Sequence, residues 1–258
     1  MERVLLIWLH NKLLYFFRGY VSNSNIIYKY RELNKTTIEL LLNCELWCAK
    51  ASSLNDPFDS QFNIEAFANS MNSALGVSEV NSGIAKRTKN AFDNFGICSF
   101  SKNNKNQVMW SHYAEQHYGL CIGFKEDDLT NENLNLSMMD VTYQEQLPEH
   151  GLFMKLPPTD TYLIATSIVD RNKFIQILTT KDQSWSYEEE RRFLSSQFGA
   201  IKFSPKCIES IMFGLRMPER DKSTLVKLLS GAEWEHIKWF QAKKSQELFS
   251  IEFEEIKI

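Results

Sequence analysis

The sequence predicts an α+β fold in which mixed or antiparallel sheets are flanked by helices. Short apolar runs of strand length recur along the chain, with helix-like stretches between them and without the regular alternation of a parallel sheet. The chain has 258 residues, of which 43% are hydrophobic, and this is enough for a substantial core. We expect one α+β domain over residues 21–258, preceded by an apolar helix over residues 1–20.

The N-terminal stretch is apolar over residues 4–9 and 13–17, but polar residues 10–12 interrupt it. A membrane span needs about 20 apolar residues. We therefore interpret residues 1–20 as a buried helix or as one that docks a partner or a second copy, with membrane association as the alternative.

The first elements of the domain follow from alternation and capping. The aromatic and basic segment Ile26–Arg31 is typical of a strand. Asn34 can cap a helix that continues to about Asn43. Residues 46–49 resemble a strand, and the Asn-Asp-Pro run in residues 52–59 favours a loop.

The centre of the chain carries two apolar runs, Gly96–Phe100 and Gly119–Phe124, of the length of buried strands. Polar and aromatic side chains are unusually dense between them; they are Trp110, Ser111, His112, Tyr113 and His117. Segments of this kind, held between two strands, often carry a functional site. Before them, residues 64–94 predict a helix with a mobile break near residues 76–83.

The second half of the chain alternates further strands and helices. We expect loops over 129–136 and 148–158, a short strand over 140–143 and a helix over 161–178. Strands over 207–213, 237–241 and 249–253, together with a helix over 218–229, complete the prediction.

Charge and cysteine content narrow the class of protein. The net charge of −3 gives no global nucleic-acid signature. The five cysteines form no C-x-x-C pair, and this fits a reducing cytoplasm and buried free thiols. A nucleophilic Cys98 paired with a histidine is the alternative, but the apolar neighbours of Cys98 favour burial.

No metal site is predicted. His112 and His117 are five residues apart, so a helix would place them roughly 140° apart rather than on one face. The sequence also lacks a glycine-rich phosphate loop and the G-x-S-x-G and H-E-x-x-H motifs.

Three groups of residues are candidates for chemistry. Arg31, beside Tyr30, can bind a phosphate or carboxylate. Ser99 and Ser101 share a strand face, where they can orient a ligand or an acid. Glu188 and Glu190 would share a face with Arg192 if that block is extended, and one can act as a base. The structural alternatives are a solvent-facing strand edge, a strand–loop junction and a solvated run of charge.

An ordered set of short motifs resembles the bacterial family called domain of unknown function 2971. The motifs span about residues 28–214, which is most of the chain. They are Tyr28-Lys29-Tyr30-Arg31, Leu46-Trp47, Asn55-Asp56-Pro57-Phe58-Asp59, Cys98-Ser99-Phe100-Ser101, Trp110-Ser111-His112-Tyr113-Ala114, His117-x-Gly119, Cys121-Ile122-Gly123-Phe124 and Tyr187-Glu188-x-Glu190-x-Arg192.

The order of Arg31, the Ser99-x-Ser101 pair and the Glu188-x-Glu190 pair is similar to that of ADP-ribosyltransferases. This resemblance implies a split sheet and NAD as the substrate. It makes Arg31 the contact to the dinucleotide, the serines a brace, and Glu190 the stabiliser of a cationic transition state with Glu188 as its partner.

The same resemblance assigns roles to the aromatic residues. Tyr30, Trp110 and Tyr113 would stack the nicotinamide ring. His112 and Tyr113 also resemble the sister arrangement, which uses His and Tyr with Glu, although here the two residues come late and adjacent.

These observations lead to three functional hypotheses. The first is a cytoplasmic, NAD-dependent ADP-ribosyltransferase-like enzyme, acting as a bacterial toxin or antiphage effector on a macromolecular acceptor that the sequence does not identify. The second is a nuclease or hydrolase with His112 or His117 as acid/base and Arg31 as phosphate clamp. The third is a non-catalytic sensor or interaction module that docks a partner through residues 1–20.

Overall fold

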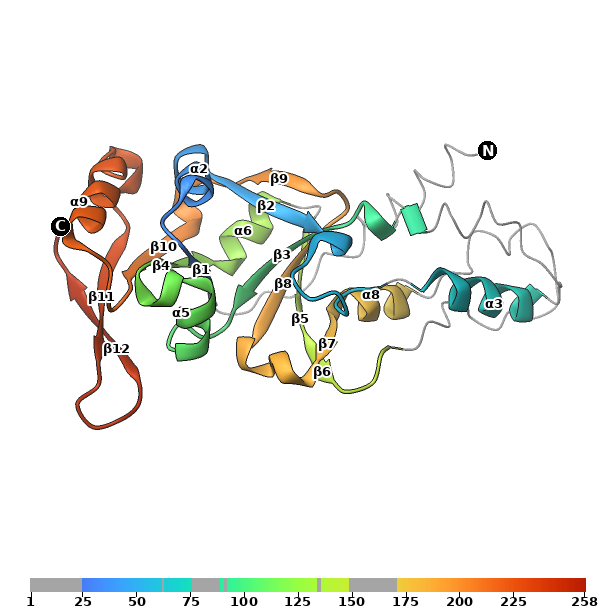
Figure 1. The fold of residues 1–258 in the computed structure, drawn as a ribbon. Coiled ribbons are helices and arrows are strands. Elements are labelled where there is room, and N and C mark those ends of the chain that lie inside the picture. Colours follow the sequence, from blue (N-terminus) through green and yellow to red (C-terminus); the bar gives the residue numbers. More distant parts are fainter. Residues whose placement is uncertain (1–24, 62, 76–88, 91, 134–135, 149–170) are drawn as a thin grey trace.

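The computed structural model describes residues 25–61, 63–75, 89–90, 92–133, 136–148 and 171–258 (Figure 1). Within these residues a large mixed sheet of 10 strands forms the centre of the molecule, and a second sheet has 2 strands. The fold is α+β, as predicted. The expected helix over residues 1–20, the break near residues 76–83, the irregular segment over 149–158 and the first part of the helix expected from residue 161 lie outside the described residues.

One half of the large sheet runs in the order β12-β11-β10-β4-β1. Its pairs are antiparallel except for the parallel pair β10 and β11. The strands in chain order are β1 (Ile26–Arg31), β4 (Leu120–Lys125), β10 (Ile208–Phe213), β11 (Lys238–Lys244) and β12 (Ile251–Ile256).

The sheet branches at β3 (Gly96–Ser101). One edge of β3 pairs along its length with β8 (Glu190–Ser195), and β8 pairs in turn with β5 (Leu136–Asp140). The other edge is shared. β1 meets it at Ser101, whereas β2 (Glu45–Lys50) meets it at Gly96 and Ile97. β2 then continues to β9 (Gly199–Lys202). The edge of β3 is therefore split around Cys98 and Ser99.

Helices and short turns lie around the sheet, and α3 extends beyond it on the right of Figure 1. The α-helices are α2 (Lys35–Asn43), α3 (Ile64–Leu75), α5 (Gln107–Tyr113), α6 (Glu126–Glu132), α8 (Arg171–Thr179) and α9 (Glu219–Leu228). The 3-10 turns are η1 (Ala51–Ser53), η2 (Glu115–His117), η3 (Gln183–Glu188), η4 (Pro205–Cys207) and η5 (Ala232–Trp234). The small parallel sheet joins β6 (Thr142–Gln144) to β7 (Thr180–Asp182).

The predicted cap of α2 is confirmed. The Asn34 side chain accepts a hydrogen bond from the Thr37 backbone N–H, and the helix ends where Cys44 adopts a left-handed conformation. None of the helices in the described ranges combines the length and apolarity that crossing a bilayer requires.

Two predictions of local structure are wrong. Residues 129–132 of the loop expected over 129–136 belong instead to α6, since Glu126, Asp127 and Asp128 lie in the first turn of this helix, where negative charge favours a helix. The block at Glu188 is not extended, because η3 ends there and Glu189 adopts a left-handed conformation with φ of 45° before β8 begins. Strand alternation therefore relates Glu190 to Arg192, but not to Glu188.

The core is divided between the two faces of the sheet. The largest cluster contains Ile27, Leu46, Cys98, Phe100, Phe124 and Phe193. A second cluster forms around Ile97, Leu194 and helix α8, and a third around Tyr30, Trp110 and Cys121. The strands that carry the candidate residues are thus fixed by packing on both sides.

Candidate functional site

The late carboxylates Glu188 and Glu190 lie in a buried ionic cluster. Glu190 accepts hydrogen bonds from Arg192 Nε at 2.8 Å and Nη2 at 3.1 Å, and its Oε2 atom lies 3.3 Å from Lys181 Nζ. Lys181 Nζ also donates to Glu188 at 2.5 Å. All four side chains are less than a tenth exposed. The two glutamates thus converge through Lys181 rather than through a shared strand face.

Asp59 supplies a third carboxylate from the loop after β2. Its oxygens accept from Arg192 Nη1 at 2.8 Å and Nη2 at 2.5 Å, and Arg192 Nη1 also donates to Ser60 Oγ and the Leu178 carbonyl. Lys181 Nζ lies 3.9 Å from Asp59. Every N–H group of Arg192 therefore donates a hydrogen bond. Such full pairing is typical of a buried ion network that supports the structure.

The cluster reaches the surface through Tyr113. The Tyr113 hydroxyl donates to Glu188 Oε1 at 2.6 Å and accepts from the exposed Asn55 amide at 3.2 Å. Burial, followed by the hydrogen bond to Glu188, raises the pKa of Tyr113. His112 is exposed, and its ring nitrogen lies 3.4 Å from the Tyr187 hydroxyl. Tyr113 and His112 therefore stand at the solvent side of the cluster.

Ser99 and Ser101, the two predicted serines, make different contacts. Ser101 is buried, and its hydroxyl donates to the Asn103 carbonyl at 3.1 Å. The Ser99 hydroxyl contributes a hydrogen bond that helps to lower the pKa of Glu190, and the Ser99 carbonyl accepts from Lys29 Nζ at 2.9 Å. Ser99 thus contacts the ionic cluster on one side and the Lys29 side of the sheet on the other.

Tyr30 and Trp110 are fixed in the core. Their rings meet edge to face with centroids 5.3 Å apart, and Trp110 is fully buried. The Tyr30 hydroxyl and the Trp110 indole N–H donate to the carbonyls of Asn103 and Asn104. This packing leaves neither ring face open to stack on a ligand.

Arg31 projects from the opposite face of the sheet to Glu190. Tyr28 is opposite Ser101, and Ser101 is opposite Glu190, so these three side chains share a face. Arg31 is three residues from Tyr28 and therefore faces the other way. The resemblance to ADP-ribosyltransferases implies that the Arg31 guanidinium and the Glu190 carboxylate point into one cleft. In the structure they point away from opposite faces of the sheet.

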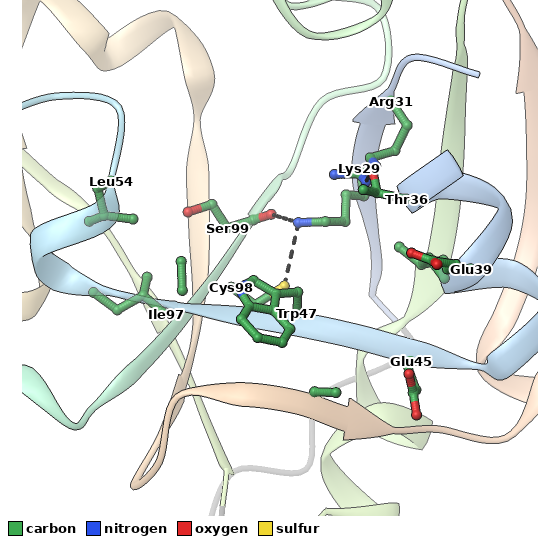
Figure 2. A pocket seen from close by; sticks show the side chains of 13 residues that line it. Lys29, Arg31, Thr36, Glu39, Glu45, Trp47, Leu54, Ile97, Cys98 and Ser99 are labelled. Atoms are coloured by element: carbon green, nitrogen blue, oxygen red, sulfur yellow. Dashed lines mark hydrogen bonds between the residues drawn. The ribbon is translucent and has the colours of Figure 1, made fainter. Parts of the chain in front are cut away.

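Arg31 instead lines a cavity of about 390 Å³ at the split edge of β3 (Figure 2). The walls come from β1, α2, β2, β3 and β9. The lining residues are Lys29, Arg31, Thr36, Glu39, Leu40, Glu45, Trp47, Ala49, Leu54, Ile97, Cys98, Ser99 and Ala200.

The cavity holds two cationic side chains. Arg31 Nε donates to Thr37 Oγ1 at 3.1 Å and Nη2 to Thr36 Oγ1 at 2.7 Å, so two threonines at the start of α2 orient the guanidinium. Lys29 Nζ donates to the Ser99 carbonyl, lies 3.4 Å from Cys98 Sγ and sits over the Phe100 ring. Within the described part of the chain, neither cation forms an ion pair with a carboxylate.

Glu39 and Glu45, the two acids that line the cavity, form ion pairs with lysines outside it. Glu45 contacts Lys202 at 2.8 Å, and Glu39 contacts Lys35 at 3.5 Å. Burial lowers the pKa of Arg31, which is the direction expected for a cation without a close anionic partner. The cavity therefore has an excess of positive charge on its β1 side.

A family model matches residues 109–193. Its description is "Protein of unknown function (DUF2971)". The matched segment supports the resemblance to this family and contains Tyr113, Lys181, Glu188, Glu190 and Arg192, but not Lys29 or Arg31. No curated protein and no solved structure matches the chain.

The sequence did not identify several residues of the buried ionic cluster and of the cavity at the split edge of β3. Lys29 could have been found, because it is two residues from Arg31 on a strand and shares its face. Trp47 belongs to a predicted strand and to a motif of the family resemblance, but the sequence assigned it no role in a site. Asp59 closes a motif of the family resemblance, but its partner Arg192 is distant in the chain, and nothing in the sequence around Lys181 indicates that it bonds Glu188 and Glu190. In the described ranges, no group of three or more His, Cys, Asp or Glu residues is arranged to hold a metal ion.

Proposed function

We propose that the protein binds a small anionic ligand of the nucleotide type in the cavity at the split edge of β3. Lys29 and Arg31 would hold its phosphate. The observation that carries the proposal is that both cations line one cavity of about 390 Å³ and that neither is paired with a described carboxylate. A partly buried guanidinium such as that of Arg31 is costly without a carboxylate partner, and a bound anion removes that cost.

The geometry of Arg31 suits a phosphate. Thr36 and Thr37 hold the guanidinium by Nη2 and Nε, while Nη1 donates to no residue in the described part of the chain. A guanidinium held in this way is pre-organised to donate to the oxygens of a phosphate, and charge-assisted hydrogen bonds of this kind are strong.

The remaining walls suit a planar ring. Trp47 is 64% exposed and lines the cavity, and Leu40, Leu54 and Ile97 add apolar surface. An exposed tryptophan beside a cationic group offers a stacking platform for a base. The volume also lies within the range of about 300–1,000 Å³ that is usual for small-molecule sites.

The chemistry beyond binding stays a prediction. Ser99 lines the cavity and also hydrogen-bonds Glu190, the residue to which the ADP-ribosyltransferase resemblance gives a role in NAD cleavage. NAD is therefore one of the ligands to test. Glu190 itself is held by Arg192 and Lys181, so transferase catalysis would require it to release one of these partners. The toxin, antiphage, nuclease and partner-docking hypotheses likewise remain predictions.

Isothermal titration calorimetry with pyrophosphate, AMP and NAD tests the proposal. We expect wild-type protein to bind at least one nucleotide, and Arg31→Gln to weaken that binding by about tenfold or more, since a charge-assisted hydrogen bond is worth about 1.5–3 kcal/mol. Arg220→Gln is the matched control, because Arg220 is exposed on α9, outside the cavity.

Two results would overturn the proposal. One is that folded wild-type protein binds none of the three probes at millimolar concentration. The other is that Arg31→Gln and Arg220→Gln bind as tightly as wild type while their thermal melts show both variants to be folded. Release of nicotinamide from NAD, lost in Glu190→Gln, would extend the proposal from binding to catalysis.

A further inference from the structure

Cys48 on β2 and Cys98 on β3 are neighbours in the same core cluster, one step beyond the last pair of the β2–β3 ladder. β2 pairs with β3 in antiparallel register, with Ala49 opposite Ile97 and Lys50 opposite Gly96. One further step in this direction brings Cys48 toward Cys98, and the two thiols are hydrogen-bonded to each other. Both cysteines are free and buried. Opposed residues on antiparallel strands have Cα atoms about 4.5–5.5 Å apart, which is within the range that a disulfide spans.

Cys98 is also the thiol that lines the cavity (Figure 2). Its sulfur lies 3.4 Å from Lys29 Nζ, which hydrogen-bonds to it. Arg31 faces the same space from β1, Glu39 from α2 and Glu45 from β2, and each of these acids is paired with a lysine outside the cavity. Cys98 is buried but lines the cavity, whereas Cys48 is not among the described lining residues, so a solute in the cavity would meet Cys98 first.

The two thiols are electrostatically distinct. A hydrogen bond from Cys48, followed by the charges of Lys29 and Arg31, lowers the pKa of the Cys98 thiol against the effect of burial. The same hydrogen bond and burial raise the pKa of Cys48. Positive groups beside a cysteine favour the thiolate, which is the reactive form.

We propose that Cys98 is a peroxide-reactive thiolate and that Cys48 is its resolving thiol. The Cys98 thiolate attacks one oxygen of hydrogen peroxide, the O–O bond breaks, and hydroxide leaves, which gives a sulfenic acid. The Cys48 sulfur then attacks the Cys98 sulfur and displaces hydroxide. The Cys48 proton neutralises it, so the products are one disulfide and one water. The peroxide is the oxidant, and the two thiols together supply two electrons.

Thiol reactivity in the reduced full-length chain tests the first step. Brief alkylation with iodoacetamide at pH 7, read by peptide mass spectrometry, should label Cys98 at least tenfold faster than the buried Cys121 and Cys207. Cys98 should also react faster than Cys44, which is more exposed but has its pKa raised by burial. Lys29→Met should slow labelling of Cys98 several-fold and leave Cys44 unchanged.

Treatment with hydrogen peroxide tests the second step. Wild-type protein should lose two hydrogen atoms and yield a cross-linked Cys48–Cys98 peptide, whereas folded Cys48→Ser should accumulate a Cys98 sulfenic acid that dimedone traps. The proposal fails if Cys44 reacts first while Cys98 stays unmodified, if Lys29→Met leaves the Cys98 rate unchanged, or if oxidised Cys98 forms no bond to Cys48. Circular dichroism verifies that each variant is folded.

Discussion

At the scale of single residues, Glu190 shows how neighbouring charges can outweigh burial. Burial alone raises the pKa of this carboxyl group, but the Arg192 guanidinium, the Lys181 ammonium and the Ser99 hydroxyl bring it down to about 2. The folded protein therefore holds Glu190 ionised under conditions in which an ordinary glutamate would be protonated. Its role in the structure is consequently that of a fixed negative charge.

This pKa shift predicts a pH dependence of stability. A carboxyl group whose pKa is lower in the folded state contributes stability above its unfolded value, here 4.5, and loses it as the pH falls toward 2. The full contribution is about 3 kcal/mol. We expect chemical denaturation of wild type to show this loss between pH 5 and 2.

The control variants separate Glu190 from other acids. Glu190→Gln should be less stable at pH 7 and should show a shallower decline below pH 5. Glu189→Gln should follow the wild-type curve, since Glu189 is exposed and outside the Lys181 and Arg192 network. Identical slopes for wild type and Glu190→Gln would contradict the assignment.

Single residues were only partly predictable from the sequence. Arg31 was recognised as an anion-binding candidate because a strand-borne arginine is suited to that role, and it does line the cavity. Its threonine partners and its distance from Glu190 could not be predicted, because they depend on how strands distant in the chain are ordered. Asp59, Lys181 and Arg192 come together for the same reason.

At the scale of elements, Arg192 ties three parts of the chain together. From β8 it bonds Glu190 on its own strand, Asp59 and Ser60 in the loop after β2, and the Leu178 carbonyl at the end of α8. These bonds join β8 to a loop and a helix that do not pair with it in the sheet. The loop that closes the ionic cluster is therefore held by this side chain.

Arg192→Met is expected to destabilise the protein by about 3–5 kcal/mol, since it leaves buried carboxylates without their partner. Arg191→Met is the matched control on the same strand. Arg191 pairs with the buried Glu126 and the exposed Asp140 on the other face and is itself 21% exposed, so its loss should cost less, about 2 kcal/mol. Urea denaturation followed by circular dichroism measures both, and equal losses would show that Arg192 does not organise these elements.

Most strands were predictable because alternation and apolar runs are local signals. β1, β3, β4 and the closing pair β11 and β12 lie where the pattern places them. Helix α6 and the turn η3 could not be predicted in this way, since both are short and polar. The left-handed Glu189 that ends η3 has no sequence signal comparable to a glycine.

At the scale of the whole molecule, the sheet order creates the cavity. β1 and β2 are neighbours in sequence but share the edge of β3, which comes later in the chain, and α2 bridges them. This arrangement brings Arg31, Trp47 and Cys98 to one hollow (Figure 2). The position of this cavity could not be predicted from the sequence, since no local pattern indicates that two strands will share one edge of β3.

A crystal structure of the wild-type protein with pyrophosphate tests the central claim most directly. We predict an anion in the cavity at the split edge of β3, with oxygens within hydrogen-bond distance of the Arg31 guanidinium and the Lys29 ammonium. The same crystals of Arg31→Gln should lack it. An anion found only beside Lys181 and Arg192, or an empty cavity at a pyrophosphate concentration that saturates binding in solution, would contradict the account.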